Sequence, residues 1–310
     1  MIDSAHDPAR DSAGDTARDG EFALLHENAE EAGIAWPGPP AVRRVSSEVD
    51  GRRVSALLWG TAPPRIVFLH GGGQNAHTWD TVLLALGEPA LAVDLPGHGH
   101  SDWREDRDYM PRASAEAVAP VLREWAPGAE LVVGMSLGGL TAIRIAARHP
   151  DLVRRAVIVD VTPSAHLRHR SMTQQQQGTT ALTRGRRTFA TFEEIVERTA
   201  AAAPHRSRAS IRRGVVHNTR RLPDGRWAWR YDRNAGPRDF SPLWADLAAT
   251  TCPLTLVRGG ASAFVPDEDA AEFVRRRPDA QVRVVAGAGH AVQSDAPLEL
   301  ADIVRAALSP

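Results

Sequence analysis

The stretch ELVVGMSLGGLTAIRIAARHP, residues 130–150, decides the fold of this chain. It predicts an apolar strand that runs up to Ser136 and a helix that begins at the next residue, so that the serine stands on a sharp strand–turn–helix elbow. Such a turn strains the serine backbone and projects the hydroxyl into a cleft. Gly134 and Gly138 fit this turn because it brings the strand and helix backbones close together. Ser136 is therefore the candidate nucleophile.

The same alternation of short apolar strands and helices extends over most of the chain. We expect strands at residues 41–49, 52–59, 65–70, 90–95, 130–136, 153–161, 253–259 and 280–287, and helices at 21–35, 76–87, 114–126, 137–150, 266–277 and 296–308. Asp50-Gly51, between the first two strands, is a hairpin signal. The continuous apolar runs that follow are typical of parallel strands buried on both faces. The expected fold is therefore α/β, with a mostly parallel sheet covered by helices on both faces.

Two segments depart from this alternation. Residues 1–20 have almost no apolar content, so we expect a disordered tail. Residues 162–240 are too long for a loop, and they contain a second hairpin signal at 223–225. We expect them to form an inserted, mainly helical lid over the carboxyl ends of the strands, between the two parts of the core, 21–161 and 241–310.

Charge is unevenly distributed along the chain. The 310 residues carry a net charge of −1, and all 37 basic residues are arginine. Residues 165–240 hold 16 of these arginines against six acidic residues. This excess predicts either a solvated arginine-rich surface or a site that attracts an anionic substrate or partner. The sequence has no zinc-finger spacing, RNA-binding aromatic motif or basic heptad helix, so we expect no nucleic-acid partner.

The sequence also favours a cytoplasmic protein without a membrane partner. No apolar run approaches the roughly 20 residues of a transmembrane helix. The first residues lack the apolar stretch of a signal peptide. The single cysteine, Cys252, excludes an intrachain disulfide. The oligomeric state stays open.

A serine hydroxyl needs a neighbouring base to become a nucleophile. His290 follows the last expected strand, in GAGH (287–290), so its loop lies at the same sheet edge as Ser136 and makes it the candidate general base. The motif HGGGQ (70–74) follows another strand at this edge and leaves backbone N–H groups accessible. One of them, together with the N–H of Leu137, is suited to stabilise an oxyanion. A phosphate-binding loop is disfavoured because no Lys-Ser/Thr pair follows these glycines.

Four motifs in this order and spacing resemble the α/β-hydrolase superfamily: HGGGQ, DLPGHGHSD (94–102), GMSLGG (134–139) and GAGH. The resemblance covers about residues 41–308. It implies the α/β-hydrolase fold, a Ser–acid–His triad and an oxyanion hole formed by the amides of Gly72 and Leu137. We expect no cofactor and no metal.

The triad acid departs from the commoner pattern of the superfamily that the chain resembles. Most members carry it after the second-last strand, but here GGASAFVP (259–266) offers no carboxylate before Asp267. A minority place it after the strand that follows the nucleophile helix, where this chain has Asp160. We prefer Asp160, because Asp267 at a helix start is explained as a cap or dipole partner. A structural Asp160 without a conventional acid stays an alternative.

Gly73, Trp79 and Met135 lie beside these residues in the sequence and are the expected walls of the substrate pocket. His166 and His169, in an arginine-rich stretch, are expected in solvent. The residues together predict hydrolysis of a small-molecule carboxylic ester or lactone through an acyl-enzyme intermediate. Because a fold does not fix a reaction, other functions stay open. They are a non-hydrolytic enzyme such as a cyclase or cofactor-independent oxygenase, a C–C bond hydrolase, and a catalytically weak ligand-binding protein.

Overall fold

The computed structural model describes residues 20–308, so the expected tail, residues 1–20, lies outside the described part of the chain except for Gly20. An eight-stranded sheet, in the order β1-β2-β4-β3-β5-β6-β10-β11, forms the body of the protein. Its strands are β1 Val42–Val49, β2 Arg52–Trp59, β3 Ile66–Leu69, β4 Ala90–Val93, β5 Leu131–Met135, β6 Ala156–Val159, β10 Leu254–Gly259 and β11 Gln281–Val285. Neighbouring strands from β4 to β11 run parallel, and the expected β1–β2 hairpin adds an antiparallel edge. The α/β prediction is confirmed.

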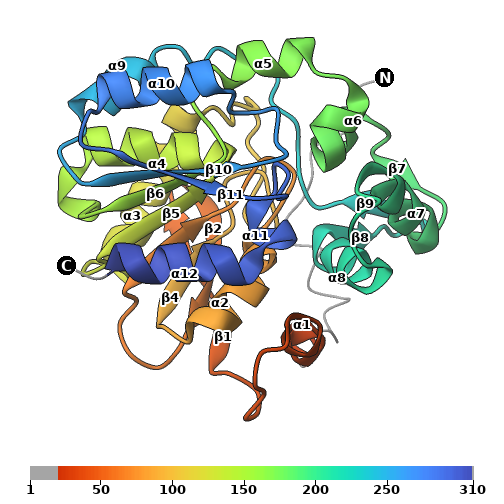
Figure 1. Ribbon diagram of the computed structural model, residues 1–310. Coiled ribbons are helices and arrows are strands. Elements are labelled where there is room, and N and C mark those ends of the chain that lie inside the picture. Colours follow the sequence, from red (N-terminus) through yellow and green to blue (C-terminus); the bar gives the residue numbers. More distant parts are fainter. Residues whose placement is uncertain (1–19, 309–310) are drawn as a thin grey trace.

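Helices cover both faces of this sheet (Figure 1). One face carries α3 Pro111–Trp125, α4 Leu137–Arg148, α9 Leu243–Ala249 and α10 Asp267–Arg276, and the other carries α1 Leu25–Ala32, α2 Asp80–Leu86 and α12 Pro297–Leu308. Side chains of successive strand residues alternate between the two cores: in β3, Val67 and Leu69 face the first group of helices, whereas Ile66 and Phe68 face the second. Helices cover both faces of the central strands, which is why these strands are apolar at every position.

Residues 165–229, here called the α5–β9 segment, form a separate layer beyond the carboxyl ends of the parallel strands (Figure 1). The segment comprises α5 Ala165–Ser171, α6 Gln174–Gln177, the 3-10 helix η4 Gly178–Arg184, α7 Phe192–Ala202, α8 Arg208–Asn218, and the strands β7 Thr188–Phe189, β8 Thr219–Arg221 and β9 Trp227–Trp229. Ile195, Val196, Val215 and Trp229 belong to its own apolar core. The hairpin predicted at 223–225 is confirmed, because β8 and β9 pair antiparallel on either side of it.

Three short helices complete the chain between residues 20 and 308: η2 Ala76–Trp79, η3 Pro150–Leu152 and α11 Val292–Asp295. None of the helices in this described part combines the length and apolar character that a membrane span requires. Helix α3 begins three residues before its expected start, because Pro111 occupies the first helical position, where the fixed φ of proline is favourable.

Asp94, which directly follows β4, joins several loops from a position without solvent exposure. Its carboxylate accepts hydrogen bonds from the Arg44 guanidinium at 2.7 Å and from the backbone N–H groups of Ala76 at 2.8 Å and His100 at 3.0 Å. Burial by itself raises the pKa of Asp94, but the charge of Arg44 and the neighbouring N–H donors lower it to about 2. Loop 94–102 therefore anchors β1 and the residues that follow β3.

Replacing Asp94 with Asn is expected to lower the free energy of unfolding by about 3 kcal/mol, because the substitution leaves the Arg44 charge without its fully buried partner. The pKa of Asp94 is lowered in the folded state, so its stabilising contribution is complete above the unfolded pKa of about 4. That contribution is lost as the pH falls from about 4 towards about 2. Urea unfolding between pH 7 and pH 3 measures both effects.

The matched control is Asp102→Asn in the same loop, whose partner Arg53 is half exposed. This variant is expected to lose less than about 1 kcal/mol. Equal losses for the two variants would show that the Asp94 contacts contribute no more than a surface ion pair.

Candidate active site

Ser136 stands on the turn between β5 and α4, with a strained backbone φ of 50° and ψ of −116°. The strand and the helix approach very closely at this turn. A Cβ atom on Gly134 would lie 2.4 Å from the carbonyl oxygen of Gly138, and one on Gly138 would lie 2.1 Å from that of Leu69. Both distances are far below van der Waals contact, so only glycine fits at either position. The turn holds Ser136 at the carboxyl end of the sheet.

Two cavities meet at Ser136. The wide cavity, of about 1360 Å³, is also lined by Gly72, Met135 and His290. The second cavity, of about 440 Å³, shares Ser136 and Gly72 with the first and is lined by Leu137 and by four arginines. We call it the arginine-lined cavity. A molecule can therefore reach the Ser136 hydroxyl with one part in each cavity.

His290, in the loop between β11 and α11, lies against Asp160. Its ring nitrogen Nδ1 lies 2.8 Å from Oδ2 of Asp160. The other ring nitrogen, Nε2, is buried and has no hydrogen-bond partner among the described residues. The ring also stacks on Phe264 with 3.5 Å between centroids and an interplanar angle of 11°. Since the carboxylate accepts from Nδ1–H, the neutral imidazole keeps its lone pair on Nε2, and His290 and Ser136 line the same cavity.

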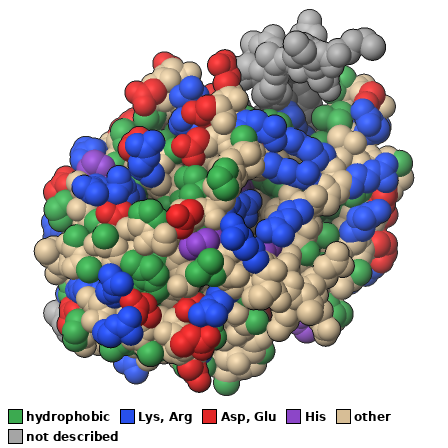
Figure 2. All heavy atoms as spheres, turned by 90° about the horizontal axis from the view of Figure 1, so that it is seen from above, with side chains coloured by type: hydrophobic (Ala, Val, Ile, Leu, Met, Phe, Trp, Pro, Cys, Tyr) green, Lys and Arg blue, Asp and Glu red, His purple; other side chains and the backbone are tan. Residues whose placement is uncertain are grey.

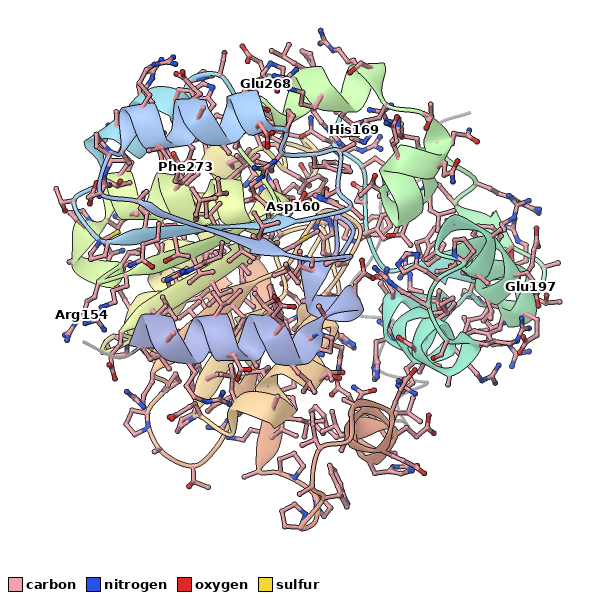
Figure 3. All side chains as sticks on the ribbon, viewed as in Figure 1. Arg154, Asp160, His169, Glu197, Glu268 and Phe273 are labelled. Atoms are coloured by element: carbon pink, nitrogen blue, oxygen red, sulfur yellow. The ribbon has the colours of Figure 1, made fainter. Side chains whose placement is uncertain are left out.

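Asp160 is completely buried after the end of β6, at the edge of the large sheet that faces the α5–β9 segment (Figure 3). Its Oδ1 accepts a hydrogen bond from the N–H of Gly259 at 2.9 Å, and its Oδ2 accepts a short one from the Ser262 hydroxyl. Both donors come from β10 and the loop after it, and β10 is the neighbour of β6 in the sheet. These contacts and the contact with His290 satisfy a carboxylate that has no access to water.

Asp267, the other candidate acid, does not reach this place. Its side chain is 95% exposed at the start of α10 and forms an ion pair with Arg258 at 2.8 Å. Of the two carboxylates that the sequence leaves as candidates, the structure therefore brings only Asp160 next to His290.

The loop after β3 carries Gly72 to the same cavities as Ser136. His70 braces this loop: its Nε2 accepts a hydrogen bond from the N–H of Leu95 at 2.9 Å, and its Nδ1 lies 2.8 Å from the carbonyl oxygen of Gly71. Burial lowers the pKa of His70, which keeps the ring neutral with the proton on Nδ1. The N–H groups of Gly72 and Leu137 have no acceptor among the described residues. They are available to a negatively charged oxygen.

Of the three residues expected to form the pocket wall, two line a cavity and one does not. Gly73 lines both cavities, under η4, where a Cβ atom would lie 2.6 Å from Cγ2 of Thr183. Met135 lines only the wide cavity and is almost entirely buried. The expectation for Trp79 is wrong: its ring has no solvent exposure and packs on Phe68 with 5.0 Å between centroids. Trp79 ends η2, which turns its side chain into the core beneath the site.

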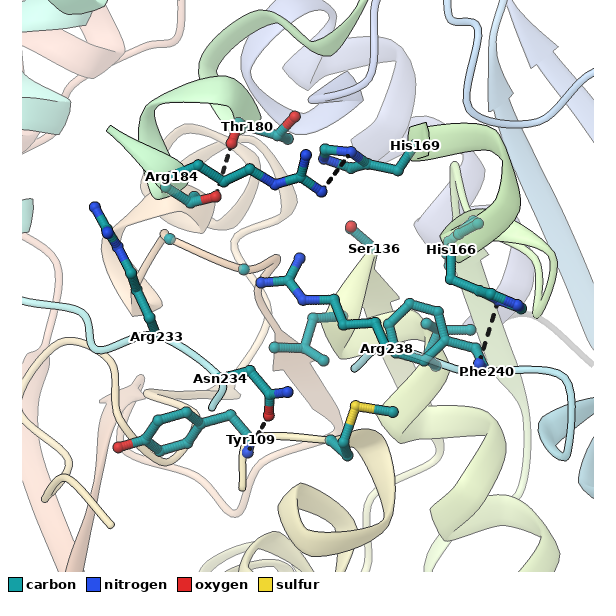
Figure 4. A pocket seen from close by; sticks show the side chains of 18 of the residues that line it. Tyr109, Ser136, His166, His169, Thr180, Arg184, Arg233, Asn234, Arg238 and Phe240 are labelled. Atoms are coloured by element: carbon teal, nitrogen blue, oxygen red, sulfur yellow. Dashed lines mark hydrogen bonds between the residues drawn. The ribbon is translucent and has the colours of Figure 1, made fainter. Parts of the chain in front are cut away.

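The expectation that His166 and His169 lie in solvent is also wrong. Both line the arginine-lined cavity (Figure 4). Nδ1 of His166 accepts a hydrogen bond from the N–H of Phe240 at 3.2 Å, and its ring is 8% exposed. Sequence reasoning missed this cavity, although the excess of arginine in residues 165–240 was a signal for it.

A group of potential metal ligands lies beside the wide cavity, where the sequence shows no metal-ligand spacing. His77, Asp80 and His217 offer donor atoms within 4.8 Å of one another. Nδ1 of His77 lies 2.9 Å from Asp80, and its Nε2 lies 3.2 Å from Glu21. Burial by itself lowers the pKa of His77, but the two carboxylates raise it to about 9. At neutral pH the ring is therefore protonated, and a metal ion would have to displace this proton in order to bind to His77.

Known proteins resemble this chain over most of its length. Residues 66–303 match the model of the alpha/beta hydrolase family. The chain is 58% identical over 289 residues to Esterase Rv0045c of Mycobacterium tuberculosis, covering 93% of this chain and 95% of that protein. It is 29% identical over 262 residues to 2-(acetamidomethylene)succinate hydrolase of Mesorhizobium japonicum, covering 82% of this chain and 91% of that protein. A crystal structure of the M. tuberculosis esterase superposes with a TM-score of 0.84 at 56% identity, covering 94% of this chain and 98% of that one.

Replacing Gly138 with Ala is expected to lower the melting temperature by several degrees, because the new Cβ atom would overlap the Leu69 carbonyl, which is rigid backbone. Thermal unfolding followed by circular dichroism measures this loss. The matched control is Gly128→Ala in the turn before β5, where a Cβ atom would meet nothing within 4 Å. A Gly138→Ala protein as stable as the control would show that β5 and α4 can separate without cost.

Proposed function

The chain belongs to the alpha/beta hydrolase family, and from this premise we propose that it is a serine esterase, which cleaves a carboxylic ester or lactone through an acyl-enzyme intermediate. The observation that carries the proposal is the contact between His290 and Asp160. This contact engages Nδ1 and leaves the other ring nitrogen, Nε2, buried and without a hydrogen-bond partner among the described residues. His290 lines the same cavity as Ser136.

In the proposed reaction, Nε2 of His290 takes the proton of the Ser136 hydroxyl while the oxygen attacks the ester carbonyl carbon. The carbonyl oxygen becomes an oxyanion, which accepts hydrogen bonds from the N–H groups of Gly72 and Leu137. The intermediate collapses as His290 gives its proton to the leaving alkoxide. A water molecule, deprotonated by His290, then attacks the acyl-enzyme and releases the acid and free Ser136.

Asp160 is proposed to hold the His290 ring in the productive tautomer and to stabilise the imidazolium that forms transiently. Phe264 supports the same orientation from the face of the ring, whereas the carboxylate supports it from the edge. The Ser262 hydroxyl donates to the carboxylate and so fixes it in turn. These contacts fix the ring, so the Ser136 hydroxyl has to turn toward Nε2, which has no partner among the described residues, before it donates its proton.

We propose that the α5–β9 segment acts as a lid over this site. The amide nitrogen of Asn218, at the end of α8, donates a hydrogen bond to the carbonyl oxygen of Gly73 at 2.6 Å. Thr183 of η4 approaches the same glycine. The segment thus touches the loop that carries Gly72, and it supplies a large share of the walls of both cavities.

Nothing in the described residues or the relatives favours the non-hydrolytic or C–C-cleaving alternatives.

Ser136→Ala is expected to reduce hydrolysis of 4-nitrophenyl butyrate by at least about a thousandfold, because the nucleophile is absent and only oxyanion stabilisation and binding remain. Covalent labelling by a fluorophosphonate probe is expected to disappear with the same substitution. The melting temperature serves as the folding control and is expected to be unchanged. Activity within tenfold of the unmodified protein would remove Ser136 from the role of nucleophile.

Asp160→Asn is expected to reduce kcat by two or more orders of magnitude, because an amide cannot stabilise the imidazolium and favours the wrong tautomer of His290. Asp267→Asn, which alters an exposed carboxylate of the other candidate position, is the matched control and is expected to change kcat less than about twofold. Steady-state kinetics with the same ester measures both variants. A larger loss of kcat for Asp267→Asn than for Asp160→Asn would assign the role of the triad acid to Asp267.

A further inference from the structure

Four arginines surround the cavity of about 440 Å³ that opens onto Ser136: Arg170, Arg184, Arg233 and Arg238. Figure 4 shows Arg184, Arg233 and Arg238 around the same space that receives Ser136. From above, basic side chains gather around a hollow on this face of the molecule (Figure 2). The cavity therefore carries a high local positive charge next to the proposed nucleophile.

Described acidic residues balance only part of this charge, since Asp239 interacts electrostatically with Arg170. The one carboxylate on the wall of the cavity, Asp232, accepts a hydrogen bond from the Tyr109 hydroxyl at 2.9 Å and pairs with Arg107 and Arg187. None of the four cavity arginines forms an ion pair with an acidic side chain between residues 20 and 308. Arginines just outside the cavity do: Arg186, for example, lies 2.9 Å from Glu194.

Three of the four arginines, Arg184, Arg233 and Arg238, are held by neutral partners or by none. Arg184 contacts Nδ1 of His169 at 3.0 Å, and Arg233 donates to the carbonyl oxygen of Gly185. Arg238 has no hydrogen-bond partner among the described residues. It keeps solvent contact inside the cavity, but desolvation by the surrounding protein and the charge of Arg184 lower its pKa. A guanidinium in this position is stabilised by an anion that enters the cavity.

The wall of the cavity combines apolar and cationic side chains. Next to Ser136 and Asp160 in the chain stand the apolar residues Leu137 and Val161, and Phe264 packs on His290. The arginines come instead from α5, from the end of η4 and from the loop after β9. A ligand that fills the cavity thus meets both apolar side chains and guanidinium groups.

We propose that the arginine-lined cavity is a subsite for an anionic group of the substrate, a carboxylate or a phosphate. Arg238 and Arg184 bind this group, because the planar guanidinium donates two parallel hydrogen bonds to such anions. The other part of the ester occupies the wide cavity. This inference rests on the proposed function of Ser136, and it names the class of substrate.

The test compares esters that differ only in charge. The first pair is 4-nitrophenyl hemiglutarate, which carries a carboxylate on the acyl part, and its neutral methyl ester. The second pair is 4-acetoxybenzoate, which carries the carboxylate on the alcohol part, and its methyl ester. The anionic member of at least one pair is expected to have a kcat/KM about ten- to a hundredfold higher than its neutral partner, as for a charge-assisted hydrogen bond. The pair that shows the preference identifies which part of the ester enters the cavity.

Arg238→Gln and Arg184→Gln are each expected to reduce this ratio at least about fivefold. The matched control is Arg226→Gln, which removes the same charge from an exposed arginine at the turn between β8 and β9 and is expected to keep the ratio. Equal kcat/KM values within both pairs, or a ratio that the Arg238 and Arg184 variants leave unchanged, would overturn the inference while the esterase proposal stands.

Binding to the Ser136→Ala protein separates the two proposals. Isothermal titration with monomethyl glutarate, an anion, and dimethyl glutarate, its neutral partner, does not depend on turnover. Binding of the anion at least tenfold tighter than its partner, with loss in a Ser136→Ala/Arg238→Gln protein, supports the anionic subsite even where no ester is hydrolysed. Equal affinities for the two compounds would contradict the subsite independently of catalysis.

Discussion

The close approach of the β5 and α4 backbones around Ser136 is the constraint from which the geometry of the site follows. Because Gly138 has no side chain, α4 can begin directly against the Leu69 carbonyl at the end of β3. Ser136 is thereby level with the carboxyl ends of β3 and β6. The loop after β3 carries Gly72 to the cavities at Ser136, and Asp160, directly after β6, contacts His290. One larger residue in this turn would move the serine away from every group that the proposed chemistry needs.

Buried polar contacts, more than apolar packing, hold the loops around this turn. A carboxylate without solvent is costly unless its oxygens are met by donors, and Asp160 has Gly259, Ser262 and His290 around it. The buried ring of His70 is also satisfied, because Nε2 accepts a hydrogen bond from the N–H of Leu95 and Nδ1 faces the carbonyl oxygen of Gly71. Except for the His70–Gly71 contact, which stays within one loop, each of these contacts joins the ends of two strands. They make the cavity rim part of the folded sheet rather than a set of independent loops.

The sheet and the positions of Ser136, His290 and Asp160 could be predicted because carboxyl ends of parallel strands meet at one edge. Strands leave a clear apolar pattern in the sequence, and the residue after each strand inherits its place from the fold. The pattern does not determine where a side chain points after a short turn. Trp79 follows the loop after β3 closely in sequence, yet η2 directs it into the core.

The α5–β9 segment was the least predictable part for a related reason. Its helices are short, and its two- and three-residue strands leave almost no periodic signal. His166 is buried by Phe240, a residue 74 positions away, and no local feature of the sequence reports that contact. The arginine excess was visible in the composition. Its concentration in one cavity depended on the fold of the segment, because arginines a few positions apart, such as Arg184 and Arg186, lie on opposite sides of that wall.

Ser136 lies between groups of opposite charge, because the arginine-lined cavity is cationic and the carboxylate of Asp160 contacts His290. Positive charge near Ser136 favours a bound anion and a developing oxyanion, whereas the proton transfer proposed for His290 places a further positive charge beside it. Asp160 is completely buried and touches the ring directly, whereas the guanidinium of Arg238 keeps solvent contact within the cavity. The carboxylate therefore acts on His290 at shorter range and with less screening than the arginines do. This difference in burial separates the cationic cavity from the carboxylate that orients the proposed general base.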